Sequence, residues 1–142
     1  MKSKALVAIS LASIAGIAQA RSSREESWQA MSTTAIAITG DIRLSPTRMV
    51  AAGHVIPLNV AADLPDYDSE VGFYPARVLK VVRPRPLKML NGNPFECARP
   101  IRWIVVYRHE RPTVLGMEAF DSEQMPRSHH DAGFCASYSY VR

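Results

Sequence analysis

The stretch IRWIVVYRHE, residues 101–110, carries the clearest strand signal in the chain. Trp103 and Val105 fall on one side of an extended backbone, and Ile104 and Val106 fall on the other. Because apolar residues stand on both sides of the backbone, the stretch predicts a central strand of a sheet.

Shorter stretches of the same kind follow one another through the rest of the chain. Alternating apolar residues between turn residues predict strands at 34–44, 48–52, 55–60, 73–82, 113–120 and 136–141, with a shorter one at 87–90. Residues 21–31 differ, because Ser23 and Glu26 have the spacing of a capping box, which predicts a short N-terminal helix or turn. Seven or eight short strands predict an all-β fold, either a small antiparallel β-barrel or a sandwich.

Residues 1–20 have the pattern of a cleavable signal peptide. Two lysines precede an apolar run at 5–17, and Ala18 and Ala20 supply the small residues that a signal peptidase accepts. The run is shorter than the roughly 20 residues needed to cross a bilayer, so the mature protein should not span a membrane. We therefore expect a soluble periplasmic or secreted protein with a single β domain at 21–142.

Size and charge restrict the kinds of partner. Without the leader, 122 of the 142 residues remain, which is the size of one domain. Two of the 17 basic residues leave with the leader, so 15 remain against 13 acidic residues, a net charge of +2. That balance does not suggest a nucleic-acid partner. The sequence contains no cofactor motif, and no cofactor is expected.

Two cysteines, Cys97 and Cys135, are expected to form a disulfide. An exported protein works in a compartment that favours such bonds. Cysteines that bind a metal usually lie roughly two to four residues apart, which these do not. In the chain-entropy model, a bond that closes a loop of this length stabilises the fold by about 4 kcal/mol.

Five basic residues gather between positions 77 and 88 without an intervening acid. They are Arg77, Lys80, Arg83, Arg85 and Lys88. Two prolines keep the RPRP segment at 83–86 extended. Because arginine offers a fork of donors to phosphate and carboxylate, we predict contact with an anionic envelope component or an acidic protein. The alternative is a solvated strand exit whose charges protect a sheet edge.

Two polar segments are expected to be loops. Residues 61–70 hold four carboxylates but lack the glycine and glutamate that a calcium loop needs, so a solvated acidic loop is predicted. Residues 121–134 include His129, His130 and Asp131. Consecutive histidines of an extended segment point to opposite sides, so a solvated corner is preferred to a metal site. These three residues become candidate metal ligands only if the backbone turns sharply there.

The sequence contains no motif that identifies an enzyme, such as a Gly-x-Ser-x-Gly elbow. We therefore expect a non-enzymatic exported binding or envelope-associated protein. In size, export signal and strand content the chain resembles the periplasmic lysozyme inhibitors, although it has no inhibitory loop motif. One alternative is a small periplasmic hydrolase or metal-dependent enzyme that uses His129, His130 and Asp131 with acids from 63–70. Another is a subunit of an envelope assembly that docks through a strand edge at Tyr138 and Tyr140.

Overall fold

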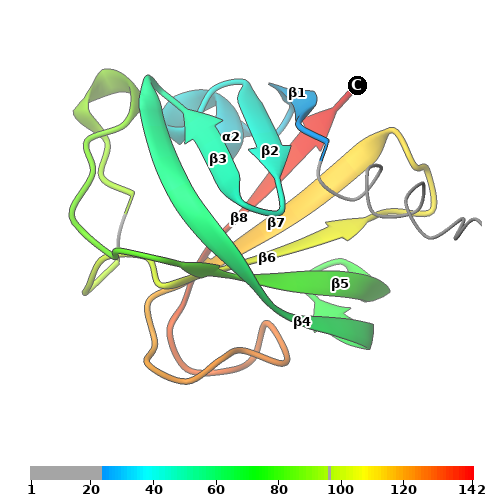
Figure 1. Ribbon diagram of the computed structural model, residues 1–142. Coiled ribbons are helices and arrows are strands. Elements are labelled where there is room, and N and C mark those ends of the chain that lie inside the picture. Colours follow the sequence, from blue (N-terminus) through cyan, green and yellow to red (C-terminus); the bar gives the residue numbers. More distant parts are fainter. Residues whose placement is uncertain (1–23, 96) are drawn as a thin grey trace, which may run out of the picture.

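Eight antiparallel strands follow one another around a closed barrel (Figure 1). They are β1 (Glu26–Ala30), β2 (Ile42–Ser45), β3 (Arg48–Ala51), β4 (His54–Ser69), β5 (Gly72–Val81), β6 (Trp103–Arg108), β7 (Val114–Phe120) and β8 (Phe134–Val141). Each strand pairs with the next along the chain, and β8 pairs with β1 to close the barrel. The all-β prediction is confirmed, and a barrel is formed rather than a sandwich. The structure is a computed structural model that describes residues 24–95 and 97–142, so the expected leader at 1–20 and the expected cap at Ser23 lie outside the described residues.

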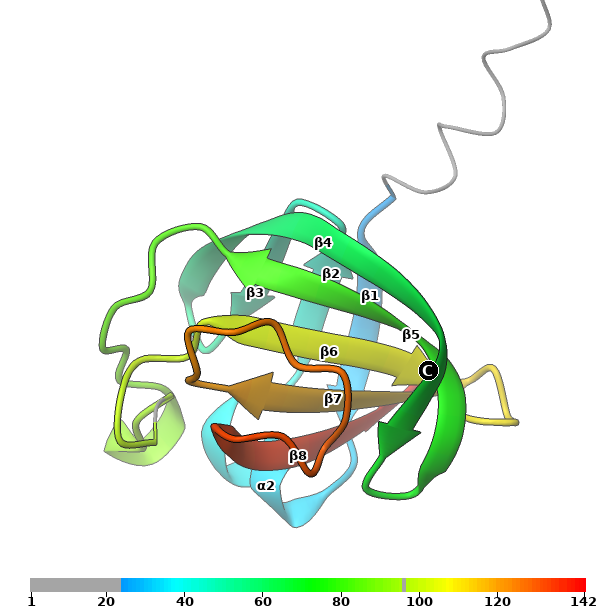
Figure 2. The same ribbon diagram turned by 90° about the horizontal axis from the view of Figure 1, so that it is seen from below.

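The strand predicted to be central is central. β6 pairs with β5 on one side and with β7 on the other, with Trp103 opposite Phe120 at its start. Ile104 belongs to the core inside the barrel, whereas Trp103 and Val105 belong to a second apolar cluster. Met125, from the loop between β7 and β8, packs against that second cluster. Figure 2 shows this loop lying across β6 and β7, so it buries the second face of the sheet.

The predicted order of elements at the N-terminus is wrong. The segment expected to be a helix or turn contains β1, and a short helix, α2 (Thr33–Ile38), follows where alternation from Thr34 predicted a strand. Ser32 caps this helix by accepting a hydrogen bond from the N–H of Ala35 at 3.2 Å. Trp28 of β1 is buried in the barrel core, and packing of its ring favours a strand over the predicted helix or turn. No helix among the described residues is long and apolar enough to span a membrane.

The acidic segment 61–70 is not a loop. β4 continues through it to Ser69 and pairs with β5 to form one long hairpin, visible at the lower right of Figure 1. The pairing register shifts between Val60 and Ala62, and again between Leu64 and Tyr67. Such shifts mark β-bulges, which bend a strand and interrupt its period-two pattern. The bulges therefore hid a continuous strand from the sequence pattern.

The connection from β5 to β6 also differs from its prediction. The expected short strand at 87–90 is reduced to one bridge, between Lys88 and Pro94, followed by a short 3-10 turn, η1 (Leu90–Gly92). Inside that turn Asn91 has a positive φ of 56°, which extended pairing does not allow. The predicted disulfide between Cys97 and Cys135 is confirmed, and it ties this connection to β8.

Candidate functional site

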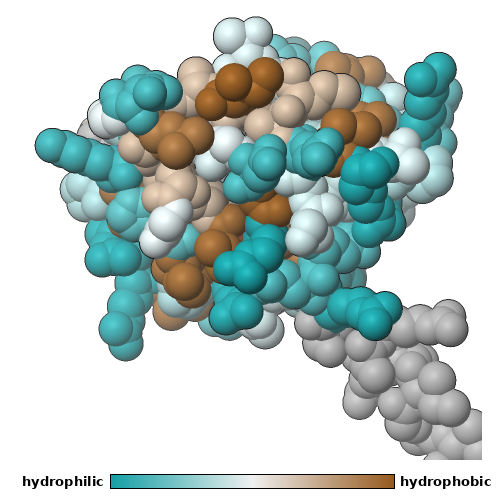
Figure 3. Space-filling view, turned by 90° about the horizontal axis from the view of Figure 1, so that it is seen from above, coloured by the Kyte–Doolittle hydropathy of each residue, from teal (hydrophilic) through white to brown (hydrophobic). Residues whose placement is uncertain are grey.

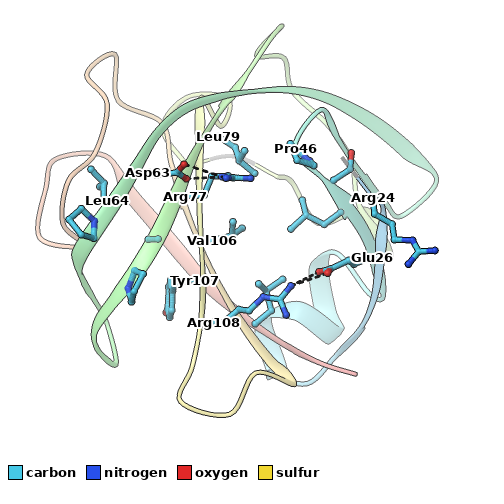
Figure 4. A pocket seen from close by; sticks show the side chains of 16 residues that line it. Arg24, Glu26, Pro46, Asp63, Leu64, Arg77, Leu79, Val106, Tyr107 and Arg108 are labelled. Carbon is cyan, nitrogen blue, oxygen red and sulfur yellow. Dashed lines mark hydrogen bonds and ion pairs between the residues drawn. The ribbon is translucent and has the colours of Figure 1, made fainter. Parts of the chain in front are cut away.

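One end of the barrel opens into a cavity of about 650 Å³ (Figure 4). The residues around it come from the start of β1, the end of β2, the β4–β5 hairpin, the end of β6 and the start of β7. Its floor is apolar and is made by Leu44, Leu79, Val106 and Leu115. These side chains also belong to the barrel core or pack against it. The cavity is therefore the mouth of the barrel interior, and we call it the barrel mouth.

Two ion pairs stand on the rim of the barrel mouth. Arg77 donates hydrogen bonds to the two carboxylate oxygens of Asp63, at 2.8 and 3.3 Å. That hydrogen bonding lowers the pKa of Asp63 and raises the pKa of Arg77. Arg108 donates to both oxygens of Glu26, at 2.7 and 3.0 Å, and Arg142 contacts the same carboxylate at 3.2 Å. Both carboxylates are thus paired with arginines.

The rim carries an excess of positive charge. Three guanidinium groups, those of Arg24, Arg77 and Arg108, line the mouth, while the lining carboxylates number two. The hydroxyls nearby are engaged, because Ser45 bonds within its own turn and Tyr107 donates to a buried carboxylate. Among the described lining residues, no nucleophile lies beside a free base, which is the arrangement covalent catalysis needs. The mouth offers apolar surface and positive charge.

The five basic residues predicted to bind an anion do not gather at one place. Arg77 lies on the rim of the mouth, and Lys80 stands 5.7 Å from the centre of a tryptophan ring. Arg83 and Arg85 are exposed and border a recess of about 20 Å³, which has room for one water molecule. Lys88 is exposed as well. Figure 3 shows a face on which hydrophilic side chains separate small apolar patches. Contact of the five basic residues with an anionic partner stays a prediction.

The histidine corner turns sharply, so the expectation that its two rings point apart is wrong. His129 and His130 lie in a turn, and their ring centres are 3.8 Å apart. The acid beside them is Asp68 of β4, whose carboxylate oxygens lie 3.8 Å from His129 and 3.6 Å from His130. Asp131 instead accepts hydrogen bonds from two main-chain N–H groups of its own turn. The structure thus joins both histidines to an acid from the 63–70 segment.

The sequence prediction missed a buried carboxylate under the β4–β5 hairpin. Glu118 of β7 is fully buried and accepts hydrogen bonds from the hydroxyls of Tyr67 at 2.9 Å and Tyr107 at 3.1 Å, and from the N–H of Glu70 at 3.0 Å. Burial, together with the charge of Glu118, raises the pKa of both tyrosines. A glutamate between a methionine and an alanine in an apolar strand was the available signal. Because the group is sealed from solvent, it fastens the hairpin rather than meeting a substrate.

A further cluster of potential ligand atoms consists of Cys97, Asp121 and Cys135. Its two sulfur atoms are bonded to each other, and Asp121 accepts a hydrogen bond from the N–H of Arg99, so this cluster is structural. The barrel mouth and the histidine turn are two places, among the described residues, where side-chain chemistry remains available. No protein-family model, curated protein or solved structure matches the chain, so a function has to rest on the chemistry of these two places.

Proposed function

We propose that the protein is an exported, non-enzymatic binding protein whose barrel mouth holds a small amphipathic anion. The observation that carries this proposal is an apolar floor surrounded by guanidinium groups. The interior of an eight-stranded barrel is just wide enough for side chains or for one small ligand, and barrel mouths are common binding sites. A component of the cell envelope with an apolar body and a carboxylate or phosphate head would fit both the apolar floor and the basic rim.

The floor would supply most of the affinity. Leu44, Leu79 and Leu115 are buried and Val106 is half-buried, so an apolar ligand would complete the top of an existing core. Removing 100 Å² of apolar surface from water stabilises a complex by roughly 2.5 kcal/mol. Part of that gain offsets the freedom that the ligand loses on binding. A ligand without an apolar body should therefore bind weakly.

The rim would select the sign of the ligand's charge. Three guanidinium groups and two carboxylates line the mouth, and this balance favours an anionic head over a cationic one. Arg77 is the residue best placed to respond, because its only ion-pair partner among the described residues, Asp63, is itself largely exposed. A ligand carboxylate could share this guanidinium with Asp63 without leaving a charge buried and unpaired.

Two features support export. The pattern of residues 1–20 is that of a cleavable leader. The bond between Cys97 and Cys135 is of a kind that persists in oxidising compartments such as the periplasm. An envelope location would also bring the barrel mouth close to amphipathic anions.

The test is calorimetric titration of the purified protein with decanoate and with decyltrimethylammonium, which share an apolar chain and differ in charge. We expect decanoate to bind and the cation to bind at least tenfold more weakly. Arg77→Gln should weaken decanoate binding about three- to tenfold, because an exposed charge contributes about 1 kcal/mol. Asp63→Asn should strengthen binding, because it frees the same guanidinium.

The matched control is the double variant Arg83→Gln, Arg85→Gln. It removes two exposed arginines that do not line the barrel mouth, so decanoate affinity should not change. Equal affinity for the anion and the cation would contradict the proposal. Loss of binding in the double variant alone would move the contact surface to the basic segment.

A further inference from the structure

We propose that Asp68, His129 and His130 form a binding site for a divalent transition-metal ion such as Zn²⁺. One ligand atom from each of the three side chains lies within 4.8 Å of the other two. None of the three lines the barrel mouth, so this site is separate from the proposed ligand site. It joins the β4–β5 hairpin to the loop between β7 and β8.

The spacing of the three side chains is close to that of a bound ion. Zinc lies about 2.1 Å from imidazole nitrogen and carboxylate oxygen, so ligand atoms around a tetrahedral ion are about 3.4 Å apart. The Asp68 carboxylate lies 3.6 Å from Nε2 of His130. At the widest separation that the cluster allows, 4.8 Å, a contraction of about 1.4 Å would complete the geometry. His130 is exposed, so its side chain can rotate toward the other two.

The main chain holds Asp68 and His129 in register. The N–H of His129 donates to the carbonyl of Asp68 at 2.9 Å, and a parallel bridge pairs Asp68 with Ser128. Nδ1 of His129 lies 2.9 Å from the same carbonyl oxygen. The same Nδ1 lies 3.8 Å from a carboxylate oxygen of Asp68, so a metal bound by Nδ1 would replace the contact of this nitrogen with the carbonyl.

The ligand set decides the class of ion. Two imidazoles and one carboxylate suit zinc, copper, nickel and iron, whereas calcium and magnesium prefer sites made of oxygen ligands. His129 and Asp68 are half-buried and His130 is exposed, so solvent would fill the remaining coordination positions. An ion there would link segments that are about 60 residues apart in the sequence.

The test is calorimetric titration of tag-free protein with ZnCl₂ in a buffer without chelating groups. We expect one ion per chain with micromolar affinity in the wild type. His129→Ala, His130→Ala and Asp68→Asn should each weaken binding at least tenfold. Saturating Zn²⁺ should also raise the melting temperature of the wild type and not that of these variants.

Controls separate the site from general binding by histidines and acids. His54→Ala removes a histidine elsewhere, and Asp66→Asn removes a carboxylate two residues away on the same strand, so neither should change the affinity for Zn²⁺. Asp131→Asn should also leave it unchanged, because the asparagine carbonyl oxygen can still accept the main-chain hydrogen bonds that shape the turn. Circular dichroism checks that each variant is folded. Absence of binding up to millimolar Zn²⁺, or equal loss in the Asp68 and Asp66 variants, would overturn the proposal.

Discussion

Removing the hydroxyl group of Tyr67 should destabilise the fold far more than the same change at Tyr74. The Tyr67 hydroxyl donates to the buried carboxylate of Glu118 at 2.9 Å, and that carboxylate has two other donors. A hydrogen bond to a charged group contributes about 1.5 to 3 kcal/mol, and water cannot reach Glu118 to replace the lost donor. Tyr67→Phe should therefore lower the free energy of unfolding by about 2 kcal/mol. For a domain of this size, the melting temperature should fall by roughly 8 °C.

Tyr74→Phe is the matched control for that experiment. Tyr74 lies opposite Tyr67 in the hairpin register, and its hydroxyl makes no hydrogen bond within the part of the chain that the structure describes. Its loss of stability should stay below about 0.5 kcal/mol. Urea unfolding followed by circular dichroism measures both variants, and the urea dependence of the free energy should not change. Equal losses for the two variants would refute the view that Glu118 fastens the hairpin through Tyr67.

Two further predictions concern stability. Replacing both Cys97 and Cys135 by Ser should lower the free energy of unfolding by about 4 kcal/mol, because the bond joins residues 38 positions apart. Urea unfolding measures this loss, and a value under about 1 kcal/mol would contradict the loop-entropy estimate. Burial raises the pKa of Tyr138 to about 12 and raises the pKa values of Tyr67, Tyr107 and Tyr140 above the ordinary tyrosine range. Because tyrosines of the unfolded chain lose their protons near pH 10, stability should hold below that pH. Above it, stability should fall by up to about 1.4 kcal/mol per pH unit for each of these four residues. Phenolate absorbance and circular dichroism should then change in one cooperative step, and phenolate formation without loss of the dichroism signal would show that the rings are accessible.

The parts of the fold that could be predicted are those where local alternation and burial agree. β6 could be identified because large apolar residues stand on both of its sides. β7 and β8 could be identified from simple alternation, with apolar residues at every second position. β4 was cut short because two bulges shift its alternation before Tyr67. The segment around Ile36 and Ile38 looked like a strand because its period-two pattern is real, although Ile36 is 57% exposed on a helix. The local feature that favours the helix over the strand is the capping hydrogen bond accepted by Ser32.

The functional residues were harder to predict because they meet across long sequence distances. The histidine pair could be noticed in the sequence, but the turn that brings its rings together depends on Asp131 accepting bonds from its own backbone. The choice of Asp68 as the neighbouring acid depends on β4 extending through the acidic segment. Arg77 was grouped with its basic neighbours by charge alone, whereas its place on β5 puts it opposite Asp63 at the barrel mouth.

The barrel is closed by only a short pairing between β1 and β8, which we call the seam. β1 pairs with β8 through Gln29 with Val141 and Ala30 with Tyr140, while the first part of β1 pairs with β2. Amide hydrogens along this seam should exchange with deuterium at a lower opening free energy than those of β6, because few pairs must break to expose them. Glu26 lies beside these pairs and also lines the barrel mouth, and Arg142 contacts its carboxylate. A ligand bound at the mouth would therefore slow the exchange. If the proposed function holds, hydrogen exchange in β1 and β8 would therefore report whether a ligand occupies the barrel mouth.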